Sequence, residues 1–294
     1  MRVGIIGCGY VGLELARQLA GDHEVIGVRR SADGADAIEA TGATAVRADL
    51  TEATDLAAVP DVDAVVFAAS SGGRGPTAAE RVYVDGLETV IEVFGGRDAP
   101  PERLIYTSST GVYGDHNGGW VDETTEPTPT TEKTRVLLEA ERVAREHAAA
   151  HGIDGQVVRF AGLYGPGRYR LQRYLDGPVT EGYLNMLHRD DAAGIVRFAL
   201  EATEEPVLLA VDDEPVDKHD FADWLADECG VARPPKQSKA ERLDGAALSE
   251  PAERRILTSK RCSNDRLGEL GYEFSYPTYR EGYRPAVEDY RNDA

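Results

Sequence analysis

The stretch Met1-Arg-Val-Gly-Ile-Ile-Gly7-Cys-Gly-Tyr-Val-Gly12 opens the chain and determines how its first part folds. A short apolar run, typical of a buried strand, is followed directly by glycines at G-x-G-x-x-G spacing. Residues 13–20 then carry apolar side chains at helical spacing. A strand, a glycine turn and a helix in this order are typical of the phosphate-binding corner of a dinucleotide-binding fold.

Each glycine of this corner has a predicted role. Gly7 permits the tight turn, Gly9 lets the backbone approach a diphosphate, and Gly12 lets the helix pack closely on the strand. The amino end of the helix directs backbone amides and the positive end of its dipole at the negative charge. We therefore expect Gly7, Gly9, Tyr10, Val11 and Gly12 to contact the cofactor.

Strand and helix signals alternate through the first two thirds of the chain. Strands are predicted at 25–28, 43–47, 64–68, 103–107, 156–160 and 206–211, and helices near 34–41, 77–95 and 132–151. Strands separated by helices indicate right-handed crossovers and a parallel sheet. The pattern therefore predicts an α/β protein with a Rossmann-like, doubly wound sheet.

A change of pattern suggests two domains. Residues 1–165 are predicted to form the dinucleotide-binding domain, and 190–211 to return to its sheet. After Gly165-Pro-Gly167 the alternation loosens, and Tyr, Pro and Arg become frequent. Residues 166–189 and 212–294 are therefore expected to form a smaller substrate-binding lobe.

Composition excludes several classes of function. The net charge of −20 over 294 residues argues against binding to nucleic acid or anionic membranes. No apolar run approaches the roughly 20 residues of a membrane span, and the first expected strand leaves no room for a targeting segment. Three distant cysteines indicate neither a disulfide framework nor a metal site. A cytoplasmic protein without a metal is expected.

Salt should stabilise the protein, because its acidic residues are spread along the whole chain and not gathered in a tail. Such a surface suits a halophilic cytoplasm, where screening over about 3 Å at 1 M salt removes the self-repulsion. The melting temperature is therefore expected to fall when KCl is removed. A melting temperature that does not change with KCl would contradict this interpretation.

The end of the second predicted strand bears on the choice of cofactor. About 20 positions after the glycines, an acid would bind the 2′-hydroxyl of the adenosine ribose, whereas Arg accommodates a 2′-phosphate. The chain has Arg29-Arg30-Ser31 there, which favours NADP(H); Asp33 close behind keeps NAD(H) as the alternative. Asp49-Leu50, after the third strand, is placed to contact the adenine.

Further segments resemble the extended short-chain dehydrogenase/reductase superfamily, in its NAD-dependent epimerase/dehydratase branch. Asp212-Asp-Glu-Pro215 and Ser259-Lys-Arg-Cys-Ser-Asn264 fit one atypical branch of it. The resemblance implies a nicotinamide cofactor contacted by Ala68, Ala69, Ser108 and Phe160. The matching motifs follow the family's order along nearly the whole chain: Phe67-Ala-Ala69, Tyr83-Val-Asp-Gly86 with Tyr83 in place of the family's Asn, Tyr106-Thr-Ser-Ser-Thr-Gly-Val-Tyr-Gly114, Arg159-Phe-Ala-Gly-Leu-Tyr-Gly-Pro-Gly167 and Asn185-Met-Leu-His-Arg-Asp-Asp-Ala192.

Catalysis in this superfamily normally uses Ser or Thr, a Tyr, and a Lys four residues after the Tyr. The Tyr transfers a proton as hydride moves to or from the nicotinamide, and the Lys lowers the pKa of the Tyr and binds the nicotinamide ribose. Ser109 fits the hydroxyl position. None of the thirteen tyrosines, however, is followed four residues later by Lys.

The helix expected to carry the missing pair can be aligned in two ways. Matching Glu141 to the family places Lys133 at the Tyr position and Leu137 at the Lys position. Matching Glu139 instead places Thr131 and Arg135 there. The Tyr-x-x-x-Lys pair is missing in either alignment.

Two substitutes for the missing pair are open. Lys133 or Arg135 could supply the positive charge while Tyr113 or Tyr164 donates the proton, or water or a substrate group could carry the proton. The substrate is expected to lie between the nicotinamide and the C-terminal lobe. The residues expected to contact it are Tyr164, Arg168, Asn185 and His188.

Two functions remain in competition. The first is an NAD(P)-dependent oxidoreductase or epimerase acting on a small hydroxyl- or carbonyl-bearing substrate, with nucleotide sugars as candidates. The second is a catalytically silent sensor of NADP(H), suggested by the missing pair. A homodimer is a further expectation, since apolar residues of the helix at 77–95 could pair two subunits or pack on the sheet: Val82, Leu87, Val90, Ile91 and Phe94.

Overall fold

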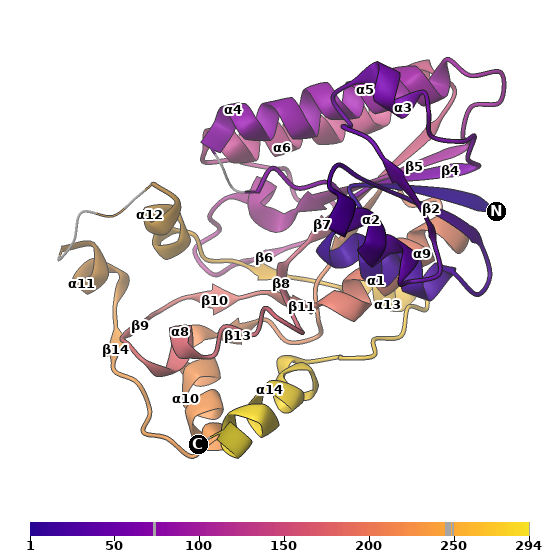
Figure 1. The fold of residues 1–294 in the computed structure, drawn as a ribbon. Helices are drawn as coiled ribbons and strands as arrows, with labels where there is room; N and C mark the ends of the chain where they lie inside the picture. Colours follow the sequence, from indigo (N-terminus) through magenta and orange to yellow (C-terminus); the bar gives the residue numbers. More distant parts are fainter. Residues whose placement is uncertain (73–74, 245–247, 249, 294) are drawn as a thin grey trace. The chain divides into compact units, whose positions relative to one another are not determined.

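The computed structural model describes residues 1–72, 75–244, 248 and 250–293 (Figure 1). The chain divides into two compact units. The first consists of Met1–Val112, Thr131–Phe160 and Arg189–Leu208, and the second of Tyr113–Thr130, Ala161–His188 and Leu209–Ala294. In this division residues 113–130 group with the second unit and residues 189–208 with the first.

A seven-stranded sheet runs through the first unit in the order β12-β7-β5-β4-β1-β2-β3. Neighbouring strands from β7 to β3 pair in parallel. All four residues of β4 are buried, as expected for a parallel strand covered on both faces. The strands are β1 (Arg2–Ile6), β2 (Glu24–Arg29), β3 (Thr44–Arg47), β4 (Ala64–Phe67), β5 (Arg103–Ser109), β7 (Asp154–Phe160) and β12 (Val207–Ala210).

Helices cover both faces of this sheet, with α1, α2 and α9 on one side and α4, α5 and α6 on the other (Figure 1). The predicted doubly wound α/β fold is therefore confirmed. The helical segments of the first unit are α1 (Tyr10–Leu19), α2 (Ala32–Glu39), α3 (Ala53–Leu56), α4 (Gly75–Glu80), η1 (Arg81–Asp85), α5 (Gly86–Gly95), α6 (Glu132–Arg142), η3 (Val143–His147), α7 (Ala148–Ala150) and α9 (Arg189–Glu201); η2 (Thr110–Tyr113) follows β5.

The apolar face of α5 is used within the chain. Leu87, Val90, Ile91 and Phe94 are each no more than 1% exposed, whereas Val82 is half-buried. These apolar residues could either pair two subunits or pack on the sheet. The burial of the four on α5 is explained by packing within one subunit. The homodimer remains a prediction that these four residues do not support.

The second unit is built from short strand pairs and helices around an aromatic core. Tyr164 stacks on Tyr283 with ring centroids 4.8 Å apart, and Phe221 meets Tyr283 edge-on at 5.2 Å. Its elements are β6 (Trp120–Val121), β8 (Gly162–Tyr164), α8 (Gln172–Leu175), β9 (Val179–Thr180), β10 (Tyr183–Leu184), β11 (Met186–His188), β13 (Val216–Asp217), α10 (Lys218–Cys229), β14 (Lys236–Gln237), α11 (Lys239–Asp244), α12 (Glu250–Leu257), β15 (Arg261–Cys262), α13 (Asp265–Glu269) and α14 (Tyr279–Asp293).

A buried ion pair joins α6 to two strands of the large sheet. Glu141 of α6 accepts hydrogen bonds from the Arg159 guanidinium of β7, the shortest at 2.7 Å. The hydroxyl of Ser108 on β5 donates to the same carboxylate at 2.5 Å. Glu141 and Arg159 are 4% and 5% exposed. Because buried charges are costly unless paired, these contacts fix the helix against the strand ends.

Candidate active site

The glycine corner is shaped by close backbone contacts. Gly7 has a φ of +84°, and a Cβ atom there would lie 2.3 Å from the Cα of Ala69. A Cβ on Gly12 would lie 3.1 Å from Cγ2 of Ile5, so the glycine lets α1 pack against β1. At Gly9, by contrast, the nearest atom to a Cβ would be 3.7 Å away. The turn and the helix packing therefore use Gly7 and Gly12, while the surface beside Gly9 is open.

The amino end of α1 has no side-chain cap. Its N-cap residue is Gly9, which has no side chain to cap the first amides, and the first turn has no acidic residue. Ser31 caps α2, Thr131 caps α6 and Asp217 caps α10, whereas α3, α8 and α13 begin without a side-chain cap, as α1 does. Uncapped amides at a helix N-terminus bind phosphate groups well. The residues at this corner therefore fit the diphosphate of a dinucleotide.

Three arginines gather where β2 and β3 end. Arg29 pairs in register with Arg47, and Arg30 follows Arg29. Among the described residues, the one ion pair of these three guanidiniums is the 3.5 Å contact between Arg30 and Asp49. Arg30 is 76% exposed in that contact, which leaves it available to a ligand. Arg47 was not among the predicted cofactor residues. The sequence signal for it was a second basic residue at the end of the neighbouring strand.

Arg29 lies close enough to the glycine corner for its charge to affect the pKa of Cys8. Burial raises the pKa of the Cys8 thiol to about 12, and the charge of Arg29 opposes this shift. Ser31 is less free than predicted, because its hydroxyl accepts a hydrogen bond from the Gly34 amide at 3.2 Å. Cys8 is therefore an unreactive buried thiol beside the cationic end of the corner.

The other predicted cofactor residues lie at the same carboxyl edge of the sheet. Ala68 and Ala69 follow β4, Ser108 and Ser109 end β5, and Phe160 ends β7 opposite Ser109. Parallel strands bring such ends together, and this edge is where ligands bind in open α/β sheets.

Asp49 and Leu50, predicted to contact the adenine, have partners of their own. Asp49 Oδ1 accepts hydrogen bonds from the amide and hydroxyl of Thr51. Leu50 packs on Gly86, where a Cβ would lie 2.0 Å from Leu50 Cδ1.

Helix α6 shows which residues stand at the two aligned positions of the missing pair. Thr131 caps the helix, so Lys133 lies in its first turn and is half-buried. Leu137, at the position of the family's Lys in one alignment, is only 8% exposed and apolar. Arg135 is exposed. Ser109 is half-buried, and its Oγ accepts a hydrogen bond from the Gly111 amide at 3.1 Å.

The predicted proton donors of the second unit serve its packing. Tyr113 is 0% exposed, and its hydroxyl donates to the carbonyl of Asp122 at 2.7 Å. Tyr164 is 2% exposed and lies in the aromatic core. Both phenols are held away from solvent within this unit. Their burial therefore does not favour Tyr113 or Tyr164 as the replacement for the family's Tyr.

The predicted substrate residues differ in their burial and in their hydrogen bonds within the second unit. His188 is 1% exposed, with its ring 3.8 Å from that of Tyr276. Asn185 donates to the carbonyl of Lys260 at 2.9 Å and accepts from the amide of Cys262 at 2.6 Å. Arg168 is exposed. A substrate contact from Asn185 would therefore require its two hydrogen bonds within the second unit to break.

Tyr83 is a buried residue after β4 that the sequence did not assign to the site. It is 8% exposed, and its phenol oxygen accepts hydrogen bonds from the amide and hydroxyl of Ser71, at 3.2 and 3.3 Å. Burial acts to raise the pKa of Tyr83, but the Ser71 bonds and the charge of Lys133 outweigh it and lower the pKa below its usual value. The signal was the substitution of Tyr for Asn in the 83–86 motif.

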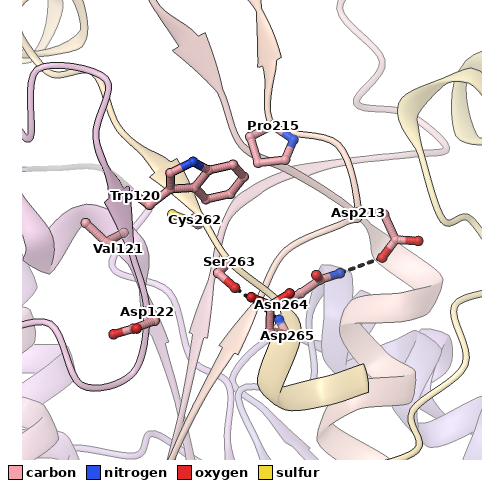
Figure 2. Close-up of a pocket in the computed structure, with 9 residues that line it drawn as sticks. All are labelled: Trp120, Val121, Asp122, Asp213, Pro215, Cys262, Ser263, Asn264 and Asp265. Carbon is pink, nitrogen blue, oxygen red and sulfur yellow. Dashed lines mark hydrogen bonds between the residues drawn. The ribbon is translucent and has the colours of Figure 1, made fainter. Parts of the chain in front are cut away.

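A pocket of about 470 Å³ lies within the second unit (Figure 2). It is lined by Trp120 and neighbours on β6, by Cys262 to Asp265, and by Asp213 and Pro215. Asn264 donates to Asp213 at 2.6 Å across it (Figure 2). These segments include the 212–215 and 259–264 motifs. None of the predicted site residues lines this pocket.

Comparisons with known proteins identify the class. The family model for the NAD dependent epimerase/dehydratase family matches residues 3–205. The chain belongs to this family. Membership supports an enzyme of this kind with a nicotinamide cofactor.

Similar proteins cover almost the full chain. Protein YeeZ of Escherichia coli is 29% identical, over 94% of this chain and 96% of its own. A functionally unknown conserved protein from Silicibacter pomeroyi has 30% identity and a TM-score of 0.75, covering 100% and 99% of the two chains. The fold is also that of UDP-glucose 4-epimerase from Thermus thermophilus in complex with NAD, with 21% identity, a TM-score of 0.80 and complete coverage of both chains.

The described part of the chain has neither a membrane-spanning helix nor a group of side chains placed to hold a metal ion. Among the described helices, none combines the length and apolar character that crossing a bilayer requires. Within the described ranges, no group of His, Cys, Asp and Glu side chains is arranged to hold a metal ion.

Proposed function

We propose that this protein is an NADP(H)-dependent oxidoreductase or epimerase acting on a small substrate that bears a hydroxyl or carbonyl group, with nucleotide sugars as candidates. The observation that carries the proposal is the uncapped amino end of α1 beside Gly9, in a chain whose helices α2, α6 and α10 are capped by side chains. Amides without a side-chain cap and a helix dipole at this edge support a bound dinucleotide diphosphate.

The protein would hold the cofactor at both ends. The amides of Tyr10, Val11 and Gly12 would bind the diphosphate, and Phe160 would line the nicotinamide end. A bound nicotinamide supplies hydride transfer to or from a substrate carbon. Ser109 would hold the substrate oxygen, because its hydroxyl proton is not used in the bond it accepts from Gly111.

The preference for NADP(H) rests on Arg29, Arg30 and Arg47. In a chain of net charge −20, three arginines at adjacent strand ends suit an added phosphate, since in the described residues only Arg30 has an ion pair, to Asp49 at 3.5 Å. NAD(H) lacks the 2′-phosphate and would gain nothing from them.

Replacing Arg29 and Arg30 together by Ala should weaken NADP⁺ binding about ten- to hundredfold, because charge-assisted bonds to the phosphate are lost. Binding of NAD⁺ should change little. Calorimetric titration with each dinucleotide measures both. Arg145→Ala, at an exposed position on η3, is the control for the loss of positive charge. An equal loss for both dinucleotides would contradict the NADP(H) assignment.

Turnover distinguishes the enzyme from the silent sensor. The enzyme should change NADPH absorbance with at least one member of a panel of sugar nucleotides, aldehydes and ketones. Epimerisation without net oxidation would instead appear as product by chromatography. Tight dinucleotide binding with neither signal would reject the enzyme and favour the sensor.

A further inference from the structure

Tyr83 sits in a distorted turn of a long helical segment. The π-turn η1, Arg81–Asp85, interrupts the helix between α4 and α5, and Tyr83 is its central residue. Such turns are rare and are frequent at functional sites. Burial to 8% exposure fixes the side chain while leaving limited access to it. The π-turn thus places the Tyr83 phenol in a helical segment whose other large buried side chains are apolar.

The phenol lies at the edge of the sheet where the cofactor is predicted. Its oxygen is bonded by Ser71, four residues after the end of β4. The next strand, β5, pairs with β4 through Phe67 and Tyr106 and ends at Ser109. Tyr83 is therefore anchored to the loop that follows one strand, while the predicted substrate-binding hydroxyl ends its neighbour.

The amide and the hydroxyl of Ser71 both donate their hydrogen bonds to the phenol oxygen of Tyr83. An oxygen that accepts two donors is stabilised when it carries negative charge. The bonds also leave the phenolic proton for another acceptor. This arrangement differs from that of Tyr113, whose hydroxyl donates its proton to a backbone carbonyl.

Lys133 supplies a cation next to this phenol. Helix α6 lies beside α4 (Figure 1) and also packs against η1, and the charge of Lys133 acts on Tyr83. Among the described residues no hydrogen bond or ion pair engages Lys133. It also lies in the first turn of α6, where the helix dipole disfavours a cation. In the described part of the chain, neither a cap nor an ion pair accounts for its position.

We propose that Tyr83 is the catalytic proton donor and acceptor and that Lys133 is its activating cation, so that residues from two helices replace the Tyr-x-x-x-Lys pair. This assignment rests on the proposed function. In reduction, the Tyr83 O–H bond breaks as a new O–H bond forms on the substrate carbonyl oxygen. The carbonyl carbon gains hydride from the reduced nicotinamide, which is oxidised. Solvent then returns a proton to the phenolate, and oxidation runs through the reverse steps.

The pKa values of the neighbouring tyrosines agree with this choice. The pKa of Tyr83 is lowered, despite burial, by the Ser71 bonds and by Lys133. Tyr106 is 0% exposed, and burial together with the charges of Tyr83 and Glu141 raises its pKa well above the usual value. Of these two phenols, Tyr83 is the one whose surroundings favour the ionised form.

A tyrosine titration tests the assignment without any substrate. In protein with ring-labelled tyrosine, NMR should show one phenol ionising at lower pH than the rest, and Tyr83→Phe should remove that signal. Lys133→Met should move it to higher pH, and Lys133→Arg should restore most of the shift. Arg81→Met is the matched control, because Arg81 lies on the same turn but donates to Thr51. A low-pH titration that survives in Tyr83→Phe would overturn the proposal.

Activity gives the second readout. With any substrate that the wild-type protein turns over, Tyr83→Phe should lower kcat about 10²- to 10⁴-fold and leave dinucleotide affinity unchanged. A Tyr83→Phe variant with the wild-type kcat would refute the catalytic role. If the wild-type protein turns over nothing, the proposed function fails, while the titration still decides whether Tyr83 and Lys133 form an activated pair.

Discussion

Replacing Gly7 by alanine is expected to abolish dinucleotide binding. The new Cβ would lie 2.3 Å from the Cα and 2.5 Å from the nitrogen of Ala69, which are backbone atoms that cannot rotate away. The φ of +84° adds strain of about 1–2 kcal/mol for a residue with a side chain. The turn and the loop after β4 must therefore move apart. Calorimetry with NADP⁺ should show no heat, and the unfolding temperature should fall.

Two companion variants separate binding from folding. A Cβ on Gly9 would meet no atom closer than 3.7 Å, so Gly9→Ala should fold normally but place a methyl group where the diphosphate is predicted. Gly21→Ala, with no atom within 4 Å of the new Cβ, should behave as wild type. If Gly9→Ala bound NADP⁺ with unchanged affinity, the diphosphate would lie elsewhere.

Replacing Glu141 by alanine is expected to cause the largest loss of stability. Breaking a buried ion pair by removing one partner costs about 3–5 kcal/mol. Here the change removes the carboxylate that accepts bonds from both Arg159 and Ser108. Urea unfolding followed by circular dichroism measures the free energy of unfolding.

The neighbouring exposed pair is the control for this variant. Glu139 on the same helix contacts Arg142 at 2.6 Å, with both side chains about half-exposed. Glu139→Ala should therefore cost far less than Glu141→Ala, because water replaces the lost partner. Equal losses for the two variants would contradict the role assigned to the buried pair. Replacing Glu141 and Arg159 together by Leu should recover stability relative to Glu141→Ala.

The sheet could be predicted because each of its signals is local. Runs such as Ala64–Phe67 are continuously apolar, as a strand buried on both faces requires, and glycines stand where the backbone must turn. The corner at Gly7 to Gly12 needs no information from the rest of the chain. Its predicted strand and helix are therefore present with small shifts at their ends.

The proton-transfer site could not be predicted in the same way. Apolar spacing predicts a continuous helix over 77–95 and gives no sign of the π-turn that presents Tyr83. The contact between Tyr83 and Ser71 depends on how a helix and a loop meet in space. Tyr164 and His188 are polar enough to suggest substrate contacts, but aromatic packing uses both in the core of the second unit.

Calorimetric titration of the wild-type protein with NADP⁺ and with NAD⁺ tests the central claim most directly, because every other assignment assumes a dinucleotide on the amides of α1. We expect saturable heat with both, and tighter binding of NADP⁺. The absence of heat with either dinucleotide, oxidised or reduced, at millimolar concentration would contradict the account.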